Sequence, residues 1–338
     1  MYLRLFLLFV VTLLGCAHSN AKPLDEQQQF INMMVEKHQF SKVDLDKIFA
    51  QANKNDNILE AIAKPWEAKP WHQYYPIFLT EKRLAKGLEF WAKYKTELAK
   101  AEQKTGVPAQ VIVAIIGVET FYGGYTGKYS VLDALTTLGF YYPPRAKFFR
   151  SELEHLLLLA REEHFDVTAL QGSYAGAMGW GQFIPSSYRA YAVDFDGDGV
   201  RDLLNNPADA IGSVANYFKR HGWQQGQDVA YPVKVSGNKY QAFLSKDLKL
   251  KDNWQSLQQA GVQLKDPNSS KQTLLASSKV KLLELEQSAD AEYWVLLPNF
   301  YTITRYNHSP LYAMVIHQFS QQLAQAFADH VSAAPLSK

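Results

Sequence analysis

Apolar side chains recur every three or four positions over most of the chain, a pattern that predicts amphipathic helices. An early helix has Phe30 and Met34 on one face, and a longer one follows over residues 84–98. The end of the chain is helical again, with an apolar face made of Tyr312, Ile316, Phe319, Leu323 and Phe327. The protein is therefore predicted to be mainly α-helical.

The pattern changes after Trp223. Short segments rich in β-branched and aromatic residues then stand in a polar background, which is typical of strands. These segments are 229–235, 240–244, 280–285 and 293–297. We expect a small β-containing subdomain over 228–297, and hence an α+β fold class that is mainly α.

Composition narrows the class of protein. At about 150 residues per domain, the 338 residues are expected to form about two domains. Hydrophobic residues make up 47% of the chain, which excludes a disordered protein. Lys plus Arg number 35 against 33 for Asp plus Glu, and this balance argues against a nucleic-acid partner.

The first fifteen residues are typical of a secretory signal peptide. Arg4 precedes an apolar run over 5–14 that is too short to span a bilayer. The run leads into Leu-Leu-Gly-Cys at 13–16, which resembles a bacterial lipobox, so Cys16 is expected to be lipidated and to begin a polar tether over 16–28. The alternative is an ordinary secretory peptide in which Cys16 is incidental.

The expected anchor also suggests a location. Cys16 is the only cysteine, so no intrachain disulfide can form. Ala17 follows it, where an Asp would suggest retention in the inner membrane. By this resemblance, we expect an outer-membrane lipoprotein that faces the periplasm.

Glu119 is the candidate for acid chemistry. It ends an apolar run over 111–118, and Ile115, Ile116 and Tyr122 lie on the same helical face. Apolar surroundings raise the pKa of a carboxyl group, which can then stay protonated near neutral pH and donate its proton. The alternative is a Glu that caps the helix or pairs with an Arg, and the pattern alone leaves both open.

Four blocks of the sequence resemble the lytic murein transglycosylase B family. In chain order they are 117–123 (Gly-Val-Glu-Thr-Phe-Tyr-Gly), 173–188 (Ser-Tyr-Ala-Gly-Ala-Met-Gly-Trp-Gly-Gln-Phe-Ile-Pro-Ser-Ser-Tyr), 209–217 (Asp-Ala-Ile-Gly-Ser-Val-Ala-Asn-Tyr) and 304–307 (Thr-Arg-Tyr-Asn). The resemblance extends over nearly the whole mature chain.

The resemblance implies a lysozyme-like catalytic core and a peptidoglycan substrate. Members of the family cut the β-1,4 bond between N-acetylmuramic acid and N-acetylglucosamine and leave a 1,6-anhydro ring. The expected organisation is a helical domain over 29–105, the catalytic core over 106–227, the β-containing subdomain over 228–297, and a C-terminal segment over 298–338 that completes the active site. Glu119 would be the single acid and base.

The resemblance also implies a set of substrate-binding residues. Ser173 and Gln182 would form hydrogen bonds with the N-acetyl group and the sugar hydroxyls, and Arg145 would face the carboxylates of the muropeptide. Tyr217, Tyr306 and Asn307 match family positions beside the acid. For each of these, the alternative is a turn or core residue.

An acidic loop predicts a cation site. Asp194, Asp196 and Asp198 have the spacing of an EF-hand loop, and Val200 would offer its backbone carbonyl. The family resemblance implies closure by Asp209 rather than by Asn205, the ordinary last position. The expected ion is a structural Ca²⁺, with Na⁺ as an alternative, and no organic cofactor is expected. The competing interpretation is a solvated acidic turn.

Two other functions remain open from the sequence. A muramidase on the same fold would transfer the sugar to water, and a non-catalytic lipoprotein would only bind the cell wall. The expected partners are peptidoglycan strands and a membrane reached through the lipid anchor. Enzymes of cell-wall synthesis are candidate protein partners.

Overall fold

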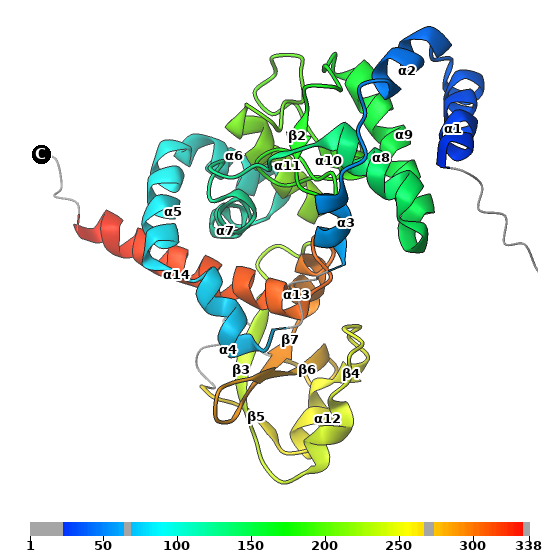
Figure 1. Ribbon diagram of the computed structural model, residues 1–338. Helices are drawn as coiled ribbons and strands as arrows, with labels where there is room; N and C mark the ends of the chain where they lie inside the picture. Colours follow the sequence, from blue (N-terminus) through cyan, green and yellow to red (C-terminus); the bar gives the residue numbers. More distant parts are fainter. Residues whose placement is uncertain (1–22, 64–68, 267–273, 334–338) are drawn as a thin grey trace, which may run out of the picture. The chain divides into compact units, whose positions relative to one another are not determined.

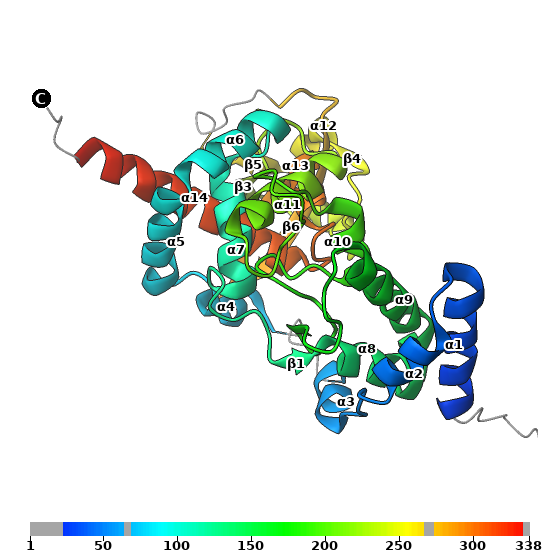
Figure 2. The same cartoon turned by 90° about the horizontal axis from the view of Figure 1, so that it is seen from above.

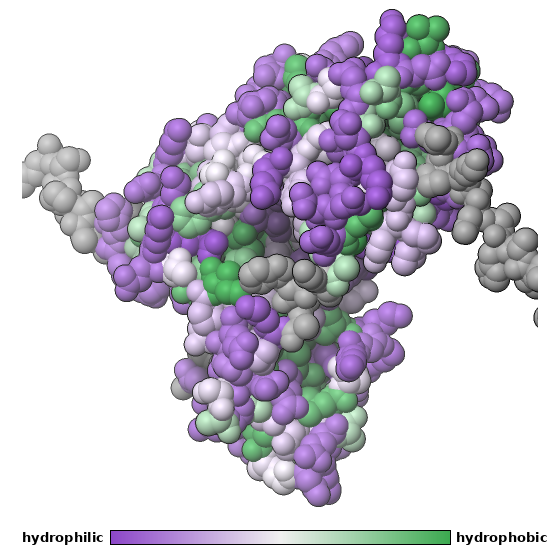
Figure 3. Space-filling model, viewed as in Figure 1, coloured by the Kyte–Doolittle hydropathy of each residue, from purple (hydrophilic) through white to green (hydrophobic). Residues whose placement is uncertain are grey.

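The computed structural model describes residues 23–63, 69–266 and 274–333. Contacts divide the chain into two compact units, Met1–Phe49 and Ala50–Lys338. The signal peptide, Cys16 and the start of the expected tether lie outside the described residues. No helix of the described part is long and apolar enough to cross a membrane. Figure 3 shows that hydrophilic residues cover much of one face of the protein.

The described part of the first unit forms the helices α1 (Pro23–His38) and α2 (Lys42–Phe49). Phe30 of α1 and Phe49 of α2 pack edge to face, with ring centroids 5.9 Å apart. The expected tether is therefore too long, because residues 23–28 are already helical. Asp25 and Glu26 lie in the first turn of α1, where carboxylates interact favourably with the helix dipole.

The second unit contains the remaining helices (Figure 1). They are α3 (Asp56–Ile62), α4 (Trp71–Tyr74), α5 (Glu81–Lys93), α6 (Lys95–Thr105), α7 (Ala109–Thr120), α8 (Val131–Tyr141), α9 (Ala146–Glu162), α10 (Pro185–Tyr191), α11 (Pro207–Arg220), α12 (Trp254–Gln259), α13 (Pro298–Ile303) and α14 (Pro310–Ala333). Short 3₁₀ turns occupy η2 (Tyr75–Ile77), η3 (Pro143–Arg145) and η4 (Lys239–Phe243).

Helix α7 is the centre of this unit. It contacts α5, α6, α11 and α14, which surround it in Figure 2. Residues 111–118 are all buried. A helix that is apolar all round is expected in such a position, because each of its faces meets a neighbour. The catalytic candidate Glu119 is thereby carried on a fully enclosed element.

A five-stranded antiparallel sheet forms a second layer, in the order β4-β6-β7-β3-β5. The strands are β3 (Ala230–Val235), β4 (Asp252–Asn253), β5 (Val262–Leu264), β6 (Lys279–Glu286) and β7 (Ala291–Leu296). Helix α14 lies between the helical layer and the sheet (Figure 1), where its His317 meets the ring of Trp294 from β7 at 5.6 Å. These elements confirm the predicted α+β, mainly helical fold class.

One predicted β segment is wrong. Residues 240–244 mostly form the 3₁₀ turn η4 instead of a strand. Strand β3 already pairs with β5 on one side and β7 on the other, so no edge of β3 is free for this segment. Tyr240 instead packs against Tyr293 of β7, with ring centroids 5.3 Å apart.

Candidate active site

Glu119 occupies the last turn of α7, immediately before a sharp change of backbone direction. Phe121, Tyr122 and Gly123 have φ values of 52°, 59° and 78°. Left-handed conformations are costly for bulky residues, and such strain concentrates at functional sites. The turn ends the helix one residue after Glu119, at Thr120, and so fixes where its carboxyl group stands.

Two glycines make room for this turn. A side chain at Gly117 would place its Cβ 2.4 Å from the hydroxyl oxygen of Tyr122, and the same holds at Gly87 of α5. Arg83 of α5 supports the turn from the other side, since its Nε donates to the carbonyl of Gly117 at 3.1 Å. The guanidinium also lies over the ring of Phe121, 5.3 Å from its centroid. Close packing therefore restricts which residues can occupy the positions around Glu119.

The carboxyl group faces a cavity of about 240 Å³. Its walls come from three separate parts of the unit: α4 with the turn after it, the end of α7, and the start of α14 with the loop before it. The lining residues are Tyr74, Ile77, Phe78, Val118, Glu119, Asn307 and Tyr312. Among these described residues Glu119 is the only one with a carboxyl group.

Burial and one hydrogen bond set the acidity of Glu119. Burial raises its pKa to about 7, while a hydrogen bond from Tyr312 acts in the opposite direction. The Tyr312 hydroxyl donates to Oε1 of Glu119 at 2.5 Å. Burial and the nearby Glu119 charge raise the pKa of Tyr312 well above its usual value, so this hydroxyl keeps its proton. At neutral pH Glu119 is divided between an acid and a base form, which suits proton transfer in both directions.

Asn307 is the one expected binding residue that lines the cavity. Its side-chain oxygen accepts a hydrogen bond from the backbone N–H of Ser309 at 2.9 Å, which leaves the amide N–H₂ to point elsewhere. Tyr306 and Tyr217 lie beside it and donate their hydroxyls at 2.5 Å to the carbonyls of Gly181 and Arg305. The two rings pack edge to face at 4.8 Å. These tyrosines therefore position the loop that carries Asn307.

Ser173 and Gln182 lie in one glycine-rich loop. The Ser173 hydroxyl oxygen accepts from the backbone N–H of Ala177 at 3.0 Å. Gln182 has a φ of 51°, and its side-chain nitrogen donates to the carbonyls of Thr126 and Gly179 at 2.9 and 3.0 Å. Both side chains hold loops together, and neither lines the cavity at Glu119.

Arg145 lies outside both the cavity at Glu119 and the glycine-rich loop. It ends the 3₁₀ turn η3, is exposed, and stacks over Phe148 and Phe149 at 4.5 and 5.1 Å from the ring centroids. It is not among the residues that line the cavity at Glu119. A role toward the substrate would therefore lie away from the acid itself.

The sequence interpretation missed Tyr312, Tyr74 and Phe78 as site residues. The apolar periodicity places Tyr312 on one face of α14, and this face is buried except for the half-buried Phe327. One signal was available, because a tyrosine on such a face needs a partner for its hydroxyl group. Nothing in the local pattern identifies that partner as Glu119.

The acidic loop brings its predicted ligands together. Carboxylate oxygens of Asp194, Asp196, Asp198 and Asp209 all lie within 4.8 Å of one another. Gly197 and Gly199 adopt φ values of 88° and 96°, which permits the tight turn between them. The Asn205 side chain instead donates to Asp202 at 3.2 Å.

The donor set fits a hard divalent cation. Three carboxylates of the loop and one from the first turn of α11 repel each other unless a cation neutralises them, and Ca²⁺ prefers oxygen ligands. Asp209 is fully buried and accepts from the backbone N–H groups of Phe195 and Asp202 at 2.7 and 2.8 Å. Burial raises the pKa of Asp209, and a bound cation would favour its charged form. Val200 follows in the same turn, with its N–H donating to Asp198 at 2.9 Å.

Known proteins resemble this chain along most of its length. A family model described as the transglycosylase SLT domain matches residues 24–321. Membrane-bound lytic murein transglycosylase B of Escherichia coli K12 is 46% identical over 309 residues, which cover 88% of this chain and 82% of the relative.

Solved structures agree with this similarity. Soluble lytic transglycosylase SltB1 of Pseudomonas aeruginosa superimposes with a TM-score of 0.84 and 45% identity, covering 90% of this chain and 99% of the other. Escherichia coli Slt35 in complex with calcium gives 0.81 and 45%, covering 89% and 93%. Pseudomonas aeruginosa SltB3 in complex with NAG-NAM-pentapeptide gives 0.79 and 29%, covering 90% and 80%.

Proposed function

Since the chain belongs to the transglycosylase SLT domain family, we propose that Glu119 is the catalytic residue of its reaction. The enzyme is a peptidoglycan lytic transglycosylase, as are its relatives of known structure. It cleaves the β-1,4 bond between N-acetylmuramic acid and N-acetylglucosamine and forms a 1,6-anhydromuramoyl product. Our proposal concerns which residues of this chain perform that reaction.

Glu119 acts first as the acid. Its proton passes to the glycosidic oxygen as the bond from that oxygen to C1 of the muramoyl residue breaks. The oxygen of the substrate's own N-acetyl group stabilises C1, as in substrate-assisted glycosidases. The released N-acetylglucosamine end carries the transferred proton as a hydroxyl hydrogen.

Glu119 then acts as the base. As a carboxylate it takes the proton of the C6 hydroxyl while that oxygen bonds to C1 and displaces the acetyl oxygen. The 1,6-anhydro ring is closed and Glu119 is protonated again, so no water enters the product. A pKa of about 7 suits a group that must both give and accept a proton near neutral pH.

The observation that carries this proposal is that the described residues lining the cavity include a single carboxyl group. Most glycosidases that transfer sugar to water use two carboxylates across the scissile bond. Of the residues that line the cavity, only Glu119 has a carboxyl group. This supports the transglycosylase reaction over a lysozyme-type muramidase.

The neighbouring residues receive supporting roles. We infer that Asn307 donates its free amide N–H to the bound sugar and that Tyr312 controls the acidity of Glu119. Ser173, Gln182, Tyr217 and Tyr306 shape the loops that enclose the substrate. Arg145 is assigned to a more distant, peptide-bearing part of the substrate.

The acidic loop is proposed as a structural Ca²⁺ site. Asp194, Asp196, Asp198 and Asp209 would hold the ion through carboxylates, and Val200 through its backbone carbonyl. The ion would neutralise the cluster and keep the loop between α10 and α11 in place. A related enzyme was solved in complex with calcium, which supports this assignment.

We further infer that the enzyme is attached to a membrane in the periplasm. One relative is named as membrane-bound. The lipobox-like segment at 13–16 supports lipidation of Cys16, and Ala17 supports the outer membrane. Enzymes of cell-wall synthesis are the candidate protein partners at that location.

Product analysis of wild type beside Glu119→Gln tests the catalytic proposal. The variant keeps the shape of the side chain but has no transferable proton, so turnover should fall by at least ~10²-fold while folding is retained. Mass spectrometry of digested sacculi should show wild-type products that are lighter by one water than hydrolysis products. Near-normal turnover by Glu119→Gln would refute the role of Glu119.

A further inference from the structure

We propose that a groove between α3 and β1 (Tyr129–Ser130) binds the charged peptide stem that the muramoyl residue carries. This inference rests on the proposed function, because it concerns the same substrate. The groove is a separate cavity of about 460 Å³, which lies in the usual size range for ligand sites. It shares no lining residue with the cavity at Glu119.

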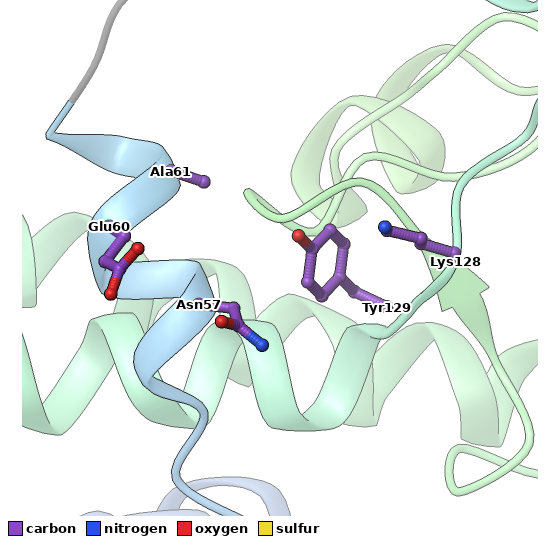
Figure 4. Close-up of a pocket in the computed structure, with 5 residues that line it drawn as sticks. All are labelled: Asn57, Glu60, Ala61, Lys128 and Tyr129. Carbon is purple, nitrogen blue, oxygen red and sulfur yellow. The ribbon is translucent and has the colours of Figure 1, made fainter.

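The groove has two facing walls. Asn57, Glu60 and Ala61 of α3 form one wall, and Lys128 and Tyr129 form the other, as Figure 4 shows. Asn57, Glu60 and Lys128 are exposed, and Tyr129 is half-buried. An aromatic ring, an amide, a carboxylate and an ammonium group therefore surround a single opening.

The charged groups of the two walls form no ion pair within the described part of the protein. Neither Glu60 nor Lys128 forms an ion pair with another described residue, and the Lys128 Nζ lies 5.7 Å from the centroid of the Tyr129 ring. A neutral sugar could not form an ion pair with either charged side chain. A peptide stem with both carboxylates and a free amino group can pair with Lys128 and Glu60 at once. Charge complementarity thus favours the stem over the glycan as occupant.

The groove adjoins the loops that we assign to the substrate. Tyr129 pairs with Gly172 across the β1–β2 ribbon, where β2 is Gln171–Gly172, and Ser173 follows directly. The carbonyl of Thr126, in the segment leading to Lys128, accepts from the Gln182 side chain at 2.9 Å. A five-residue stem, as in the NAG-NAM-pentapeptide in complex with a relative, spans up to ~17 Å when extended, which allows it to bind at a place other than the one that holds the glycan.

Both walls are fixed to the same helix, α8. The backbone N–H groups of Asn53 and Asn55, which precede α3, donate to Asp133 and Thr137 of α8 at 2.8 and 3.0 Å. Ser130 of β1 caps α8 by accepting from the Asp133 N–H at 3.1 Å. The groove is therefore preformed, and little ordering is needed when the stem binds.

Paired substrates test the proposal. Glycan strands with intact stems and strands from which an amidase has removed the stems are cleaved by wild type, Lys128→Met, Glu60→Gln and Tyr129→Ala. We expect KM to rise roughly tenfold for the stem-bearing strands alone, the size of effect that follows from losing one charge-assisted contact. Lys95→Met, at another exposed lysine, is the matched control and should change neither KM.

A binding measurement separates this inference from the catalytic one. NAG-NAM-pentapeptide is titrated by calorimetry into Glu119→Gln with and without Lys128→Met, where no turnover is needed. Weaker binding in the double variant supports the groove. An equal rise in KM on both kinds of strand would mean that the groove binds glycan, and no change on either would leave it a surface groove. Both outcomes overturn the proposal, whereas the role of Glu119 fails only if Glu119→Gln still turns over.

Discussion

At the scale of single residues, Glu119 is defined by two opposing influences. Burial at the end of α7 disfavours its carboxylate, and the Tyr312 hydroxyl stabilises the same carboxylate through a hydrogen bond. Burial has the larger effect, so the pKa rises to about 7. In the proposed mechanism, this balance lets Glu119 hold the proton that it gives to the glycosidic oxygen and then serve as the base in its carboxylate form.

Tyr312→Phe tests this balance. The variant removes the hydrogen bond that lowers the pKa of Glu119, so that pKa should rise further. Activity requires the protonated acid and is lost as the pH rises through its pKa. We therefore expect the alkaline limb of the pH profile of kcat/KM to move to higher pH in Tyr312→Phe.

The control for that experiment is Tyr306→Phe. Tyr306 donates to the Gly181 carbonyl instead of to Glu119, so its removal should leave the position of the alkaline limb unchanged, whatever it does to the rate. A limb that stays in place or moves to lower pH in Tyr312→Phe would show that Tyr312 does not stabilise the carboxylate.

At the scale of elements, the end of α7 is shaped by close packing. Consecutive left-handed residues follow Glu119, and the ring of Tyr122 fills the space that Gly117 and Gly87 leave open. The Tyr122 hydroxyl is buried and has no hydrogen-bond partner among the residues that the structure describes, and burial raises its pKa well above the usual value. An unpartnered buried hydroxyl is costly, which indicates that the shape of the turn is maintained at the expense of stability.

Gly117→Ala should disrupt that turn. The added Cβ would stand 2.4 Å from the Tyr122 oxygen and force the ring to move. Overpacking of this kind costs about 1–3 kcal/mol, and displacement of the turn should also lower activity. Thermal or urea unfolding together with turnover measures both effects.

Gly124→Ala is the matched substitution in the same segment. Its Cβ would meet nothing closer than 3.3 Å, so its effect on the free energy of unfolding should be less than about 1 kcal/mol. Equal losses of stability in the two variants would argue against a specific role for the contact between Gly117 and Tyr122.

The acidic loop is the second element with a testable property. If Ca²⁺ binds only the native loop, excess Ca²⁺ should raise the Tm on the order of 5 °C. Asp209→Ala should abolish this calcium-dependent increment, because Asp209 is the buried carboxylate of the cluster. Asp209 also accepts two backbone hydrogen bonds, so the increment is the relevant quantity and the absolute Tm is not.

Asn205→Ala is the control for the closing ligand. Its side chain bonds to Asp202 and not to the cluster, so most of the calcium-dependent increment should remain. If Asn205→Ala loses the increment and Asp209→Ala keeps it, the loop is an EF-hand of ordinary length. A wild-type protein that does not respond to Ca²⁺ would mean a solvated acidic turn.

At the scale of the whole molecule, the second unit brings three distant segments around one carboxyl group. The segments are 74–78, 118–119 and 307–312, and they come from α4 with η2, from α7, and from the loop before α14 with its first turn. Because α14 also separates the helical layer from the sheet, the β-containing subdomain supports the element that carries Tyr312.

Membrane attachment is also a property of the whole molecule. Cys16→Ser should release the enzyme into the soluble periplasmic fraction, because acyl chains on Cys16 would carry the attachment. Cell fractionation with immunodetection measures this. Ala17→Asp, which keeps the cysteine, should leave the enzyme on membranes but move it to the inner membrane. If Cys16→Ser still pellets with outer membrane, another anchor holds the protein.

The sequence by itself determined the features that depend on neighbours along the chain. Apolar periodicity predicted α1, α7, α14 and the strands β3, β6 and β7, because burial of one face imposes a regular spacing on the apolar residues. The single helix predicted over 84–98 is wrong, since the structure divides it at Tyr94 into α5 and α6. The run before Glu119 predicted apolar surroundings that would raise its pKa but left a capping or paired Glu open, and the spacing of Asp194, Asp196 and Asp198 predicted a cluster that does form. The spacing of the three aspartates needs only a turn to bring them together, whereas the pKa of Glu119 also requires the helices that bury the end of α7.

The tertiary structure alone decided which groups meet. Tyr312 lies 193 positions from Glu119, and their hydrogen bond exists only because α14 packs along α7. Residues 240–244 have strand-like composition but form a 3₁₀ turn, because both edges of β3 are already paired. A side chain's acidity, and a segment's pairing, depend on partners brought from far along the chain, and that information is absent from any local pattern.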